Sequence, residues 1–459
     1  MNFPAASSAG YQSETILTAP RGSKKGTALT LALGNGLRFY LTKIIFTRYN
    51  QMNNMRGRTM ELSIERKTPR KEIKARISTF QEALMQLEVD LAIVVQNADL
   101  FYFSGTIQGG YLLIPMEGEP VFAATGDAHR IEQESGIDKI VPITGIKEIP
   151  GLCKEILRLE PRTVGLEFDV LPVSLYHRVC ALLHGCSAVD VSNSIRKIRM
   201  LKSSYEINKI RESAMIYGEA LSHLPEILRP GITEVDLESE LVRLARRRSH
   251  FGAHRVRGFN QESYYGHVLA GPRGAVPSML KSPTGGLGST PAFGYGSGHW
   301  AIEENSPILI DMCFGIDGYL ADQTRTAVIG KLPASLNSAY EKLLTLKKEI
   351  EGLLRPGAIC EEVYFQALDK AESLGLTKNF MGAGERKARF VGHGIGLEMD
   401  EWPVIGKGFR TALAPGMVLA VEPKLIFHGI GAIGLEDNYV ITEEGCENLT
   451  PLDECIIEI

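Results

Sequence analysis

Two pairs of acidic residues in the second half of the chain could hold metal ions. The first pair, Asp311 and Asp322, flanks the turn-forming segment Gly315–Gly318. The pair is centred within this segment, which predicts a hairpin that sets the two aspartates directly opposite each other, about 4.5–5.5 Å apart at Cβ. Carboxylates at that spacing repel one another, and a divalent cation between them removes the cost. Taken alone, two strand-end aspartates that cap turns would explain the pattern equally well.

A second acidic pair repeats this arrangement further along the chain. Glu422 and Glu436 are centred on Gly429, within the turn-like segment His428–Gly431. A hairpin there would present two facing glutamates, although Glu436 could instead lie on a solvated strand edge. Two such hairpins in one half of the chain favour a common metal site.

A histidine between glycines could complete the ligand set. His393 lies in Val391–Gly396, where three glycines allow the backbone to bend tightly around the imidazole. A lone histidine is more often a packed or exposed residue, but four acids and one imidazole can bind a pair of divalent ions. Oxygen donors favour Mn, with Co, Zn and Fe as alternatives. Two ions about 3.5–4 Å apart can share a water molecule as the nucleophile.

An internal repeat indicates how these residues are positioned. Arg229–Gly231 (Arg-Pro-Gly) recurs at Arg355–Gly357, and each copy follows one helical stretch and precedes another. Thr233 is available as an N-cap in the first copy. Pro-Gly between two helices is common, but a β-rich stretch after both copies predicts a duplicated α+β half with a site at its seam.

The first half of the chain has the pattern of a small α/β domain. An amphipathic helix is expected over Lys71–Leu87, followed by a buried strand at 90–95 and further strands at 110–115 and 121–124. Strands then alternate with helical stretches to about residue 190. The basic segment 195–202 is interpreted as a connector. The predicted division is a basic extension at 1–60, an N-terminal domain at 61–200 and a catalytic domain at 201–459.

Composition indicates ordinary globular domains. The 459 residues are 44% hydrophobic and 23% charged, and seven scattered cysteines favour a reducing cytoplasm. The net charge of −4 and the absence of a basic stripe argue against nucleic acid as a partner.

The first 59 residues are basic, with eight Lys or Arg and one acid, Glu14. They do not follow the order of a targeting peptide, and the most apolar stretch, 28–46, contains Arg38 and Lys43, which argue against a membrane span. We therefore expect a non-functional upstream extension that precedes alternative starts such as Met60.

Five motifs of the second half resemble those of the creatinase/prolidase/aminopeptidase P family, metallopeptidases with a pita-bread fold. The motifs are Asp311–Thr326, Gly392–Leu397, Glu401 with Pro403, Val421–Pro423, and Leu435–Asp437 with Glu444 and Gly445. The resemblance extends over about residues 203–459, and residues 61–200 resemble the creatinase-like N-terminal domain of the family.

This resemblance implies that the four acidic residues and His393 are the ligands of two metal ions. Asp311 and Asp322 would bind one metal ion, and Asp322, His393 and Glu422 would bind the other, with Asp322 and Glu436 as bridges. Glu422 would also shuttle the proton. The implied substrate is a peptide with proline in second position, cleaved at the Xaa-Pro bond, and the implied assembly is a homodimer.

The groups expected to contact substrate depart from the family pattern. Its two substrate-side histidines fall at Ser278 and Asp400, and its arginine falls at Gly434. Unless other cations enter the site, we expect neutral or cationic substrates to be preferred over free carboxylates. The candidate substrate-side residues are His254, Arg255, Arg257, His267, His299 and Asp400. A glycine-rich segment at 282–298 is either a surface loop or a lid that carries Phe293, Tyr295 or His299.

Three functions are compatible with these patterns. The leading hypothesis is a metal-dependent Xaa-Pro aminopeptidase or dipeptidase with a peptide substrate. The alternatives are a metal-dependent hydrolase of small non-peptide amides or other C–N bonds, and a non-catalytic binding protein of the same fold. No membrane association is expected.

Overall fold

A computed structural model describes residues 66–459 apart from positions 263, 385 and 451. The predicted basic extension at 1–60 therefore lies outside the described residues. Within the described part of the chain, no helix is both long and apolar enough to cross a membrane.

The N-terminal part forms a six-stranded mixed sheet in the order β4-β3-β2-β1-β5-β6. Its central strand β1 is buried along its whole length, because the sequence Leu-Ala-Ile-Val has apolar side chains for both faces of the sheet. The strands are β1 (Leu91–Val94), β2 (Gly110–Pro115), β3 (Val121–Ala124), β4 (Lys139–Pro142), β5 (Thr163–Leu166) and β6 (Ser187–Asp190). The helices are α2 (Arg70–Gln86), α3 (Asn97–Ser104), α4 (Ala128–Glu134), η1 (Ile146–Glu148), α5 (Ile149–Leu157), α6 (Val173–Leu182) and α7 (Ser192–Met200).

The predicted connector at 195–202 is largely helical. Helix α7 covers most of this segment, and its Arg199 is 3% exposed. The basic residues of this segment include buried partners for acids elsewhere in the fold, so the segment is also part of the packed structure.

The second part of the chain pairs helices with antiparallel strands. Its helices are α8 (Ser204–Ser222), α9 (Leu224–Ile227), α10 (Glu234–Arg247), η2 (Gly271–Ala275), α11 (Ala334–Leu353) and α12 (Cys360–Ser373). The strands that build the site are β7 (Gly266–Ala270), β8 (Ile308–Ile316), β9 (Tyr319–Val328), β12 (Phe390–Gly394), β13 (Glu401–Gly406), β14 (Val418–Val421), β15 (Lys424–Phe427), β16 (Gly431–Gly434) and β17 (Asp437–Ile441). The remaining short strands are β10 (Gly382–Ala383), β11 (Arg386–Lys387), β18 (Cys446–Asn448) and β19 (Ile457–Glu458).

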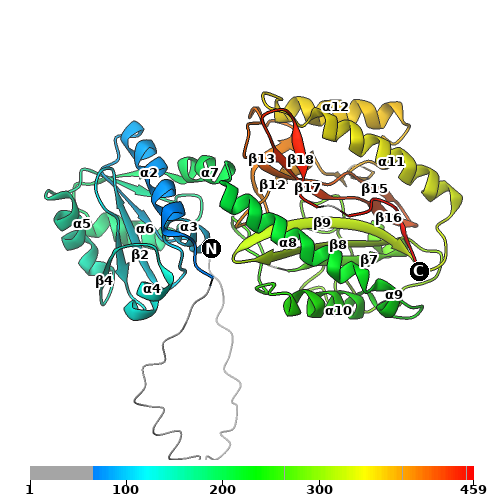
Figure 1. The fold of residues 1–459 in the computed structure, drawn as a ribbon, viewed down its shortest axis with the longest axis horizontal. Coiled ribbons are helices and arrows are strands. Elements are labelled where there is room, and N and C mark those ends of the chain that lie inside the picture. The colour runs from blue at the N-terminus through cyan, green and yellow to red at the C-terminus, as the bar shows by residue number, and fades with distance from the viewer. Residues whose placement is uncertain (1–65, 263, 385, 451) are drawn as a thin grey trace, which may run out of the picture. The chain divides into compact units, whose positions relative to one another are not determined.

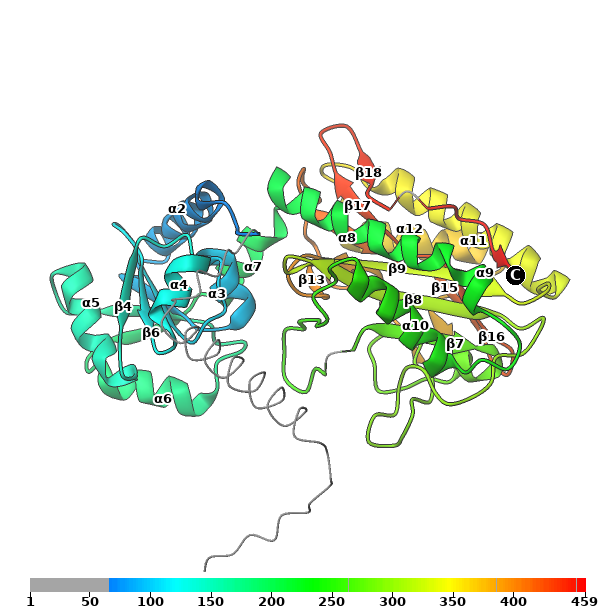
Figure 2. The same ribbon diagram turned by 60° about the horizontal axis from the view of Figure 1, so that its bottom comes forward.

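Two sheets meet where the acidic residues lie. One has the order β19-β9-β8-β7 and the other β13-β12-β14-β17-β18. An antiparallel bridge between Thr324 of β9 and Glu436, just before β17, joins them. Helix α8 packs along β8 and β9, and α11 and α12 lie beside the second sheet (Figures 1 and 2).

The internal repeat corresponds to structure. Each Arg-Pro-Gly segment lies between two helices, α9 and α10 in the first copy and α11 and α12 in the second, and antiparallel strands follow both. Thr233 caps α10 as predicted, because its side chain accepts a hydrogen bond from the Asp236 amide. The predicted α/β fold class is confirmed, because a mixed sheet with helices precedes a second part built of helices and antiparallel strands.

Candidate metal centre

The first acidic pair lies on the hairpin of β8 and β9. Asp311 pairs with Thr324, while Asp322 pairs with Cys313. The predicted position of the aspartates directly opposite each other was therefore wrong, because Asp311 lies opposite a residue two positions after Asp322. The reason is the two-residue turn at Asp317 and Gly318, which both have positive φ and so twist with the strands. Both aspartates still project from one face, because side chains two apart on a strand share a face.

The second hairpin has the predicted register. Strands β15 and β16 pair Phe427 with Gly431 around Gly429. The adjoining strands β14 and β17 pair Val421 with Asp437 in the same register. Glu422 and Glu436, which lie between these two ladders, therefore face each other.

His393 projects from β12 toward these glutamates. Its Nδ1 lies 3.0 Å from the Gly394 carbonyl oxygen, which accepts a hydrogen bond from the ring. This bond leaves Nε2 as the free lone pair, 3.7 Å from Glu422 Oε1 and 3.9 Å from Glu436 Oε1. The imidazole is therefore oriented as a metal ligand would be.

Three buried groups converge closely enough to share one cation. Ligand atoms of Asp322, His393 and Glu436 all lie within 4.8 Å of one another. Burial, and then repulsion from Glu436 and Asp311, raises the pKa of Asp322 well above its usual value. Burial, with a contribution from Glu422, raises the pKa of Glu436 to about 7. A divalent ion would relieve this crowding, so the donor set fits one ion.

The other two predicted ligands are engaged by a lysine that the sequence analysis missed. Lys424 is 1% exposed, and its Nζ lies 2.8 Å from Asp311 Oδ2, 2.6 Å from Glu422 Oε2 and 3.1 Å from Glu436 Oε2. Burial opposes the charge of Lys424, but the three carboxylates outweigh it and raise its pKa. Asp311 is buried too, yet Lys424 and His267 lower its pKa. In the sequence, this contact was indicated by the position of Lys424 two residues after Glu422, because side chains at that spacing on a strand share a face.

Lys424 thus contacts three of the four carboxylates that the resemblance assigns to a pair of ions. Asp311 is the only residue assigned to the first ion alone, and one of its oxygens is held by Lys424. The residues therefore fit one divalent ion, held by Asp322, His393 and Glu436.

The centre opens into a cavity of about 330 Å³. An adjoining cavity of about 600 Å³ shares several walls with it, including Phe390, His393 and Asp400. The outer cavity is basic, and its charged lining residues besides Asp400 are Lys281, Lys387, Arg389 and Lys407. Cations therefore do surround the approach to the site, although they are not the ones that the sequence analysis nominated.

Among the nominated substrate-side residues, His267 and Asp400 line the inner cavity. His267 Nε2 lies 3.3 Å from Asp311 Oδ2, and Asp400 Oδ1 lies 3.7 Å from His393 Nδ1. His254 instead is buried with its Nε2 2.5 Å from the Cys313 carbonyl oxygen, and His299 is exposed. Neither of these two lines the described cavities, so their nomination is corrected.

Parts of the glycine-rich segment 282–298 border the cavities. Ser282 lines both, and Tyr295 lines the inner one. Phe293 packs on Tyr295 with ring centroids 4.2 Å apart, and Tyr264 of the inner cavity wall contacts the same cluster. This segment is thus placed beside the site, as the lid hypothesis requires.

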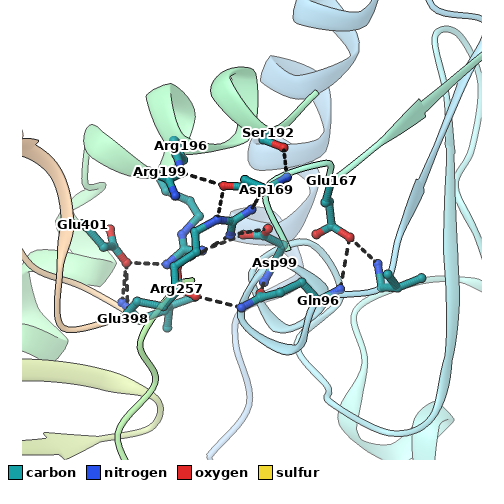
Figure 3. Close-up of polar contacts among 12 residues, drawn as sticks. Gln96, Asp99, Glu167, Asp169, Ser192, Arg196, Arg199, Arg257, Glu398 and Glu401 are labelled. Carbon is teal, nitrogen blue, oxygen red and sulfur yellow. Dashed lines mark hydrogen bonds and ion pairs between the residues drawn. The ribbon is translucent and has the colours of Figure 1, made fainter. Parts of the chain in front are cut away.

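Arg257, another nominated residue, is part of a buried ionic network (Figure 3). Its guanidinium binds Asp169 at 2.7 Å and Asp99 at 2.7 Å. Arg199 bridges Asp99, Glu398 and Glu401 at 2.6, 2.9 and 2.5 Å.

Glu401 of this network fixes the loop that follows His393. Its Oε1 accepts hydrogen bonds from the amides of Leu397 and Glu398 at 2.8 and 3.1 Å. Lys202 binds its other oxygen at 3.0 Å. The network therefore anchors the chain between His393 and Asp400.

A buried carboxylate–histidine cluster where two antiparallel sheets meet, preceded by an α/β domain, is typical of metallohydrolases. Comparison with known families agrees. Residues 208–443 match the description "Metallopeptidase family M24" and residues 76–201 match "Creatinase/Prolidase N-terminal domain". The chain belongs to metallopeptidase family M24 and is a hydrolase of the peptidase type.

Curated and solved relatives share this organisation. An Xaa-Pro dipeptidase of Pyrococcus horikoshii is 25% identical over 374 residues, which cover 80% of this chain and 95% of the relative. An uncharacterized peptidase of Bacillus subtilis, YqhT, is 26% identical over 80% of this chain and 94% of its own length. The structure of an Xaa-Pro dipeptidase from Bacillus anthracis has a TM-score of 0.71 at 23% identity, covering 84% of this chain and all of the other.

Proposed function

We propose that this chain is a metal-dependent Xaa-Pro peptidase, an aminopeptidase or dipeptidase that hydrolyses the amide bond before proline. The observation that carries the proposal is the cluster of Asp322, His393 and Glu436 beside Glu422, at the base of a cavity. Relatives named Xaa-Pro dipeptidase support the substrate class. The proposed ion is Mn²⁺, because most donors are oxygens.

Each residue of the centre has a distinct proposed role. Asp322, His393 and Glu436 would hold the ion, which when bound polarises the amide carbonyl and activates water. Glu422 is the proposed proton shuttle: Lys424 holds its Oε2, so that Oε1, on the side of His393, is left to move the proton.

The outer cavity is proposed to receive the carboxylate end of the peptide. Its basic residues, such as Arg389 and Lys407, supply the positive charge that is missing at Ser278, Asp400 and Gly434. A preference for neutral or cationic substrates was predicted only if no other cations enter the site. These basic residues would supply such cations, so free peptide acids become the expected substrates.

The experiment is hydrolysis of a panel of Xaa-Pro dipeptides and longer Xaa-Pro peptides with and without added MnCl₂. Activity should appear with Mn²⁺, disappear with a chelator, and be abolished in Asp322→Asn, which should also bind the metal more weakly. Turnover by Asp322→Asn close to that of the unmodified protein would refute the assigned role.

A hydrolase of small non-peptide amides is the second candidate. It is favoured by the replacement of the substrate-side histidines and arginine by Ser278, Asp400 and Gly434. Cleavage of N-acyl amides without cleavage of Xaa-Pro peptides would select it. A homodimer and a cytoplasmic location remain predictions from the resemblance and from cysteine usage.

A further inference from the structure

We infer that the Lys424 ammonium group takes the place of one metal ion, so that the chain has a single-ion centre instead of the ion pair that its acidic residues suggest. This inference deepens the proposed function and rests on it for the identity of the centre.

The contacts of Lys424 are those expected of a substitute cation. Its Nζ lies within 3.1 Å of oxygens from Asp311, Glu422 and Glu436. An ammonium group has three hydrogen-bond donors, and three carboxylate oxygens are available to accept them. One of these carboxylates was assigned to the first ion, one to the second and one to both. The ammonium group therefore lies among the residues that would otherwise join two ions.

The opposite strand is adapted to this lysine. Lys424 pairs with Gly434 across the hairpin of β15 and β16. A Cβ atom at Gly434 would lie 2.6 Å from Lys424 Cγ and 3.4 Å from Lys424 Cβ. A side chain at position 434 would thus collide with the lysine stem. The family pattern has an arginine at the position of Gly434. The cation that is missing from β16 is therefore offset by Lys424 on the paired strand β15.

The groups that remain still form a site for one ion. Asp322, His393 and Glu436 converge without Asp311 or Glu422. Asp311 is occupied by Lys424 at 2.8 Å and approached by His267 at 3.3 Å, both of which are nitrogen groups. If the four carboxylates are ionised, Lys424 and one divalent ion leave the centre at −1, whereas adding a second ion would place two dications beside the ammonium group.

Metal counting on the intact protein tests the inference. The protein purified without chelator is dialysed against MnCl₂, and Mn²⁺ per chain is measured by elemental analysis alongside the EPR spectrum. We expect one Mn²⁺ per chain and the six-line spectrum of an isolated ion. Two ions per chain, an exchange-coupled spectrum or the absence of specific binding would each overturn the inference.

Mn²⁺ binding by single variants distinguishes the residues that hold the ion from those that contact Lys424. Asp311→Asn should retain one Mn²⁺, whereas Asp322→Asn should bind it at least about tenfold more weakly because it loses a direct ligand. Lys424→Gly should bind two, since it frees Asp311 and opens space above Gly434. Lys347→Met is the matched control: Lys347 is equally buried and is paired with Asp437 at 2.8 Å, and its loss should leave one ion.

The outcomes remain informative in each case. Loss of Mn²⁺ from Asp311→Asn, or a folded Lys424→Gly that still binds one ion, would overturn the inference. If Lys424→Gly does not fold, the stoichiometry and spectrum of the unmodified protein decide. Failure to cleave Xaa-Pro peptides would overturn the proposed function alone, because the metal count does not depend on the substrate.

Discussion

Replacing Arg199 by Met should be among the more damaging single substitutions outside the metal centre. The side chain is 3% exposed and bridges Asp99, Glu398 and Glu401 at 2.5–2.9 Å (Figure 3). Removal of one member of a buried ion pair costs about 3–5 kcal/mol when its partner is left uncompensated.

The retained partners set the expected cost at the lower end of that range. Asp99 keeps Arg257 at 2.7 Å, and Glu401 keeps Lys202 at 3.0 Å. No acid is left entirely without a cation, so we expect a loss of about 3 kcal/mol in the free energy of unfolding. Because Glu401 fixes the loop after His393, kcat/KM should also fall.

Urea denaturation followed by circular dichroism measures this loss, and Arg196→Met is the matched control. Arg196 lies on the same helix but is 27% exposed and makes one ion pair, with Asp169, at 2.9 Å. Such a pair contributes about 1 kcal/mol or less. Equal losses in the two variants would refute the reasoning, as would full additivity of Arg199→Met with Glu401→Gln, because residues in one ionic network should couple.

Three further predictions concern substrate, pH and the N-terminal segment. Arg389→Gln should raise KM for a free Xaa-Pro acid about fivefold, equivalent to ~1 kcal/mol of a charge-assisted contact, and leave KM for its amidated counterpart unchanged; equal effects on both substrates would exclude a carboxylate contact. Burial lowers the pKa of His250 from 6.5 to about 4. Between these two pH values the unfolded chain binds a proton that the folded chain does not. The free energy of unfolding should therefore decrease by up to about 3 kcal/mol as the pH falls from 6.5 to about 4. Urea denaturation at several pH values should show a shallower dependence in His250→Gln, while exposed His299→Gln should match the unmodified protein; an unaltered pH dependence in His250→Gln would be inconsistent with this assignment. A chain that begins at Met60 should bind Mn²⁺, melt and react like the full chain, and a large drop in its melting temperature would show that residues 1–59 contribute to the fold.

The sequence predicted the features that depend on local pattern. The hairpin centred on Gly429 and the cap at Thr233 follow from turn chemistry and spacing within a few residues, and both are present. The order of motifs identified the family. The hairpin of Asp311 and Asp322 differs from the prediction by two residues of pairing, because its turn lies at Asp317 and Gly318, whose positive φ angles match the twist of the strands.

Only the tertiary structure determined which side chains share the centre. Lys424 and Asp311 are 113 residues apart and lie on different hairpins, so no local pattern relates them. Their contact depends on the bridge between Thr324 and Glu436, which brings the two sheets together, and on the space that Gly434 leaves for the lysine stem. The sequence thus determined the acidic ligands available to the centre, whereas long-range packing decided which of them a buried ammonium group neutralises.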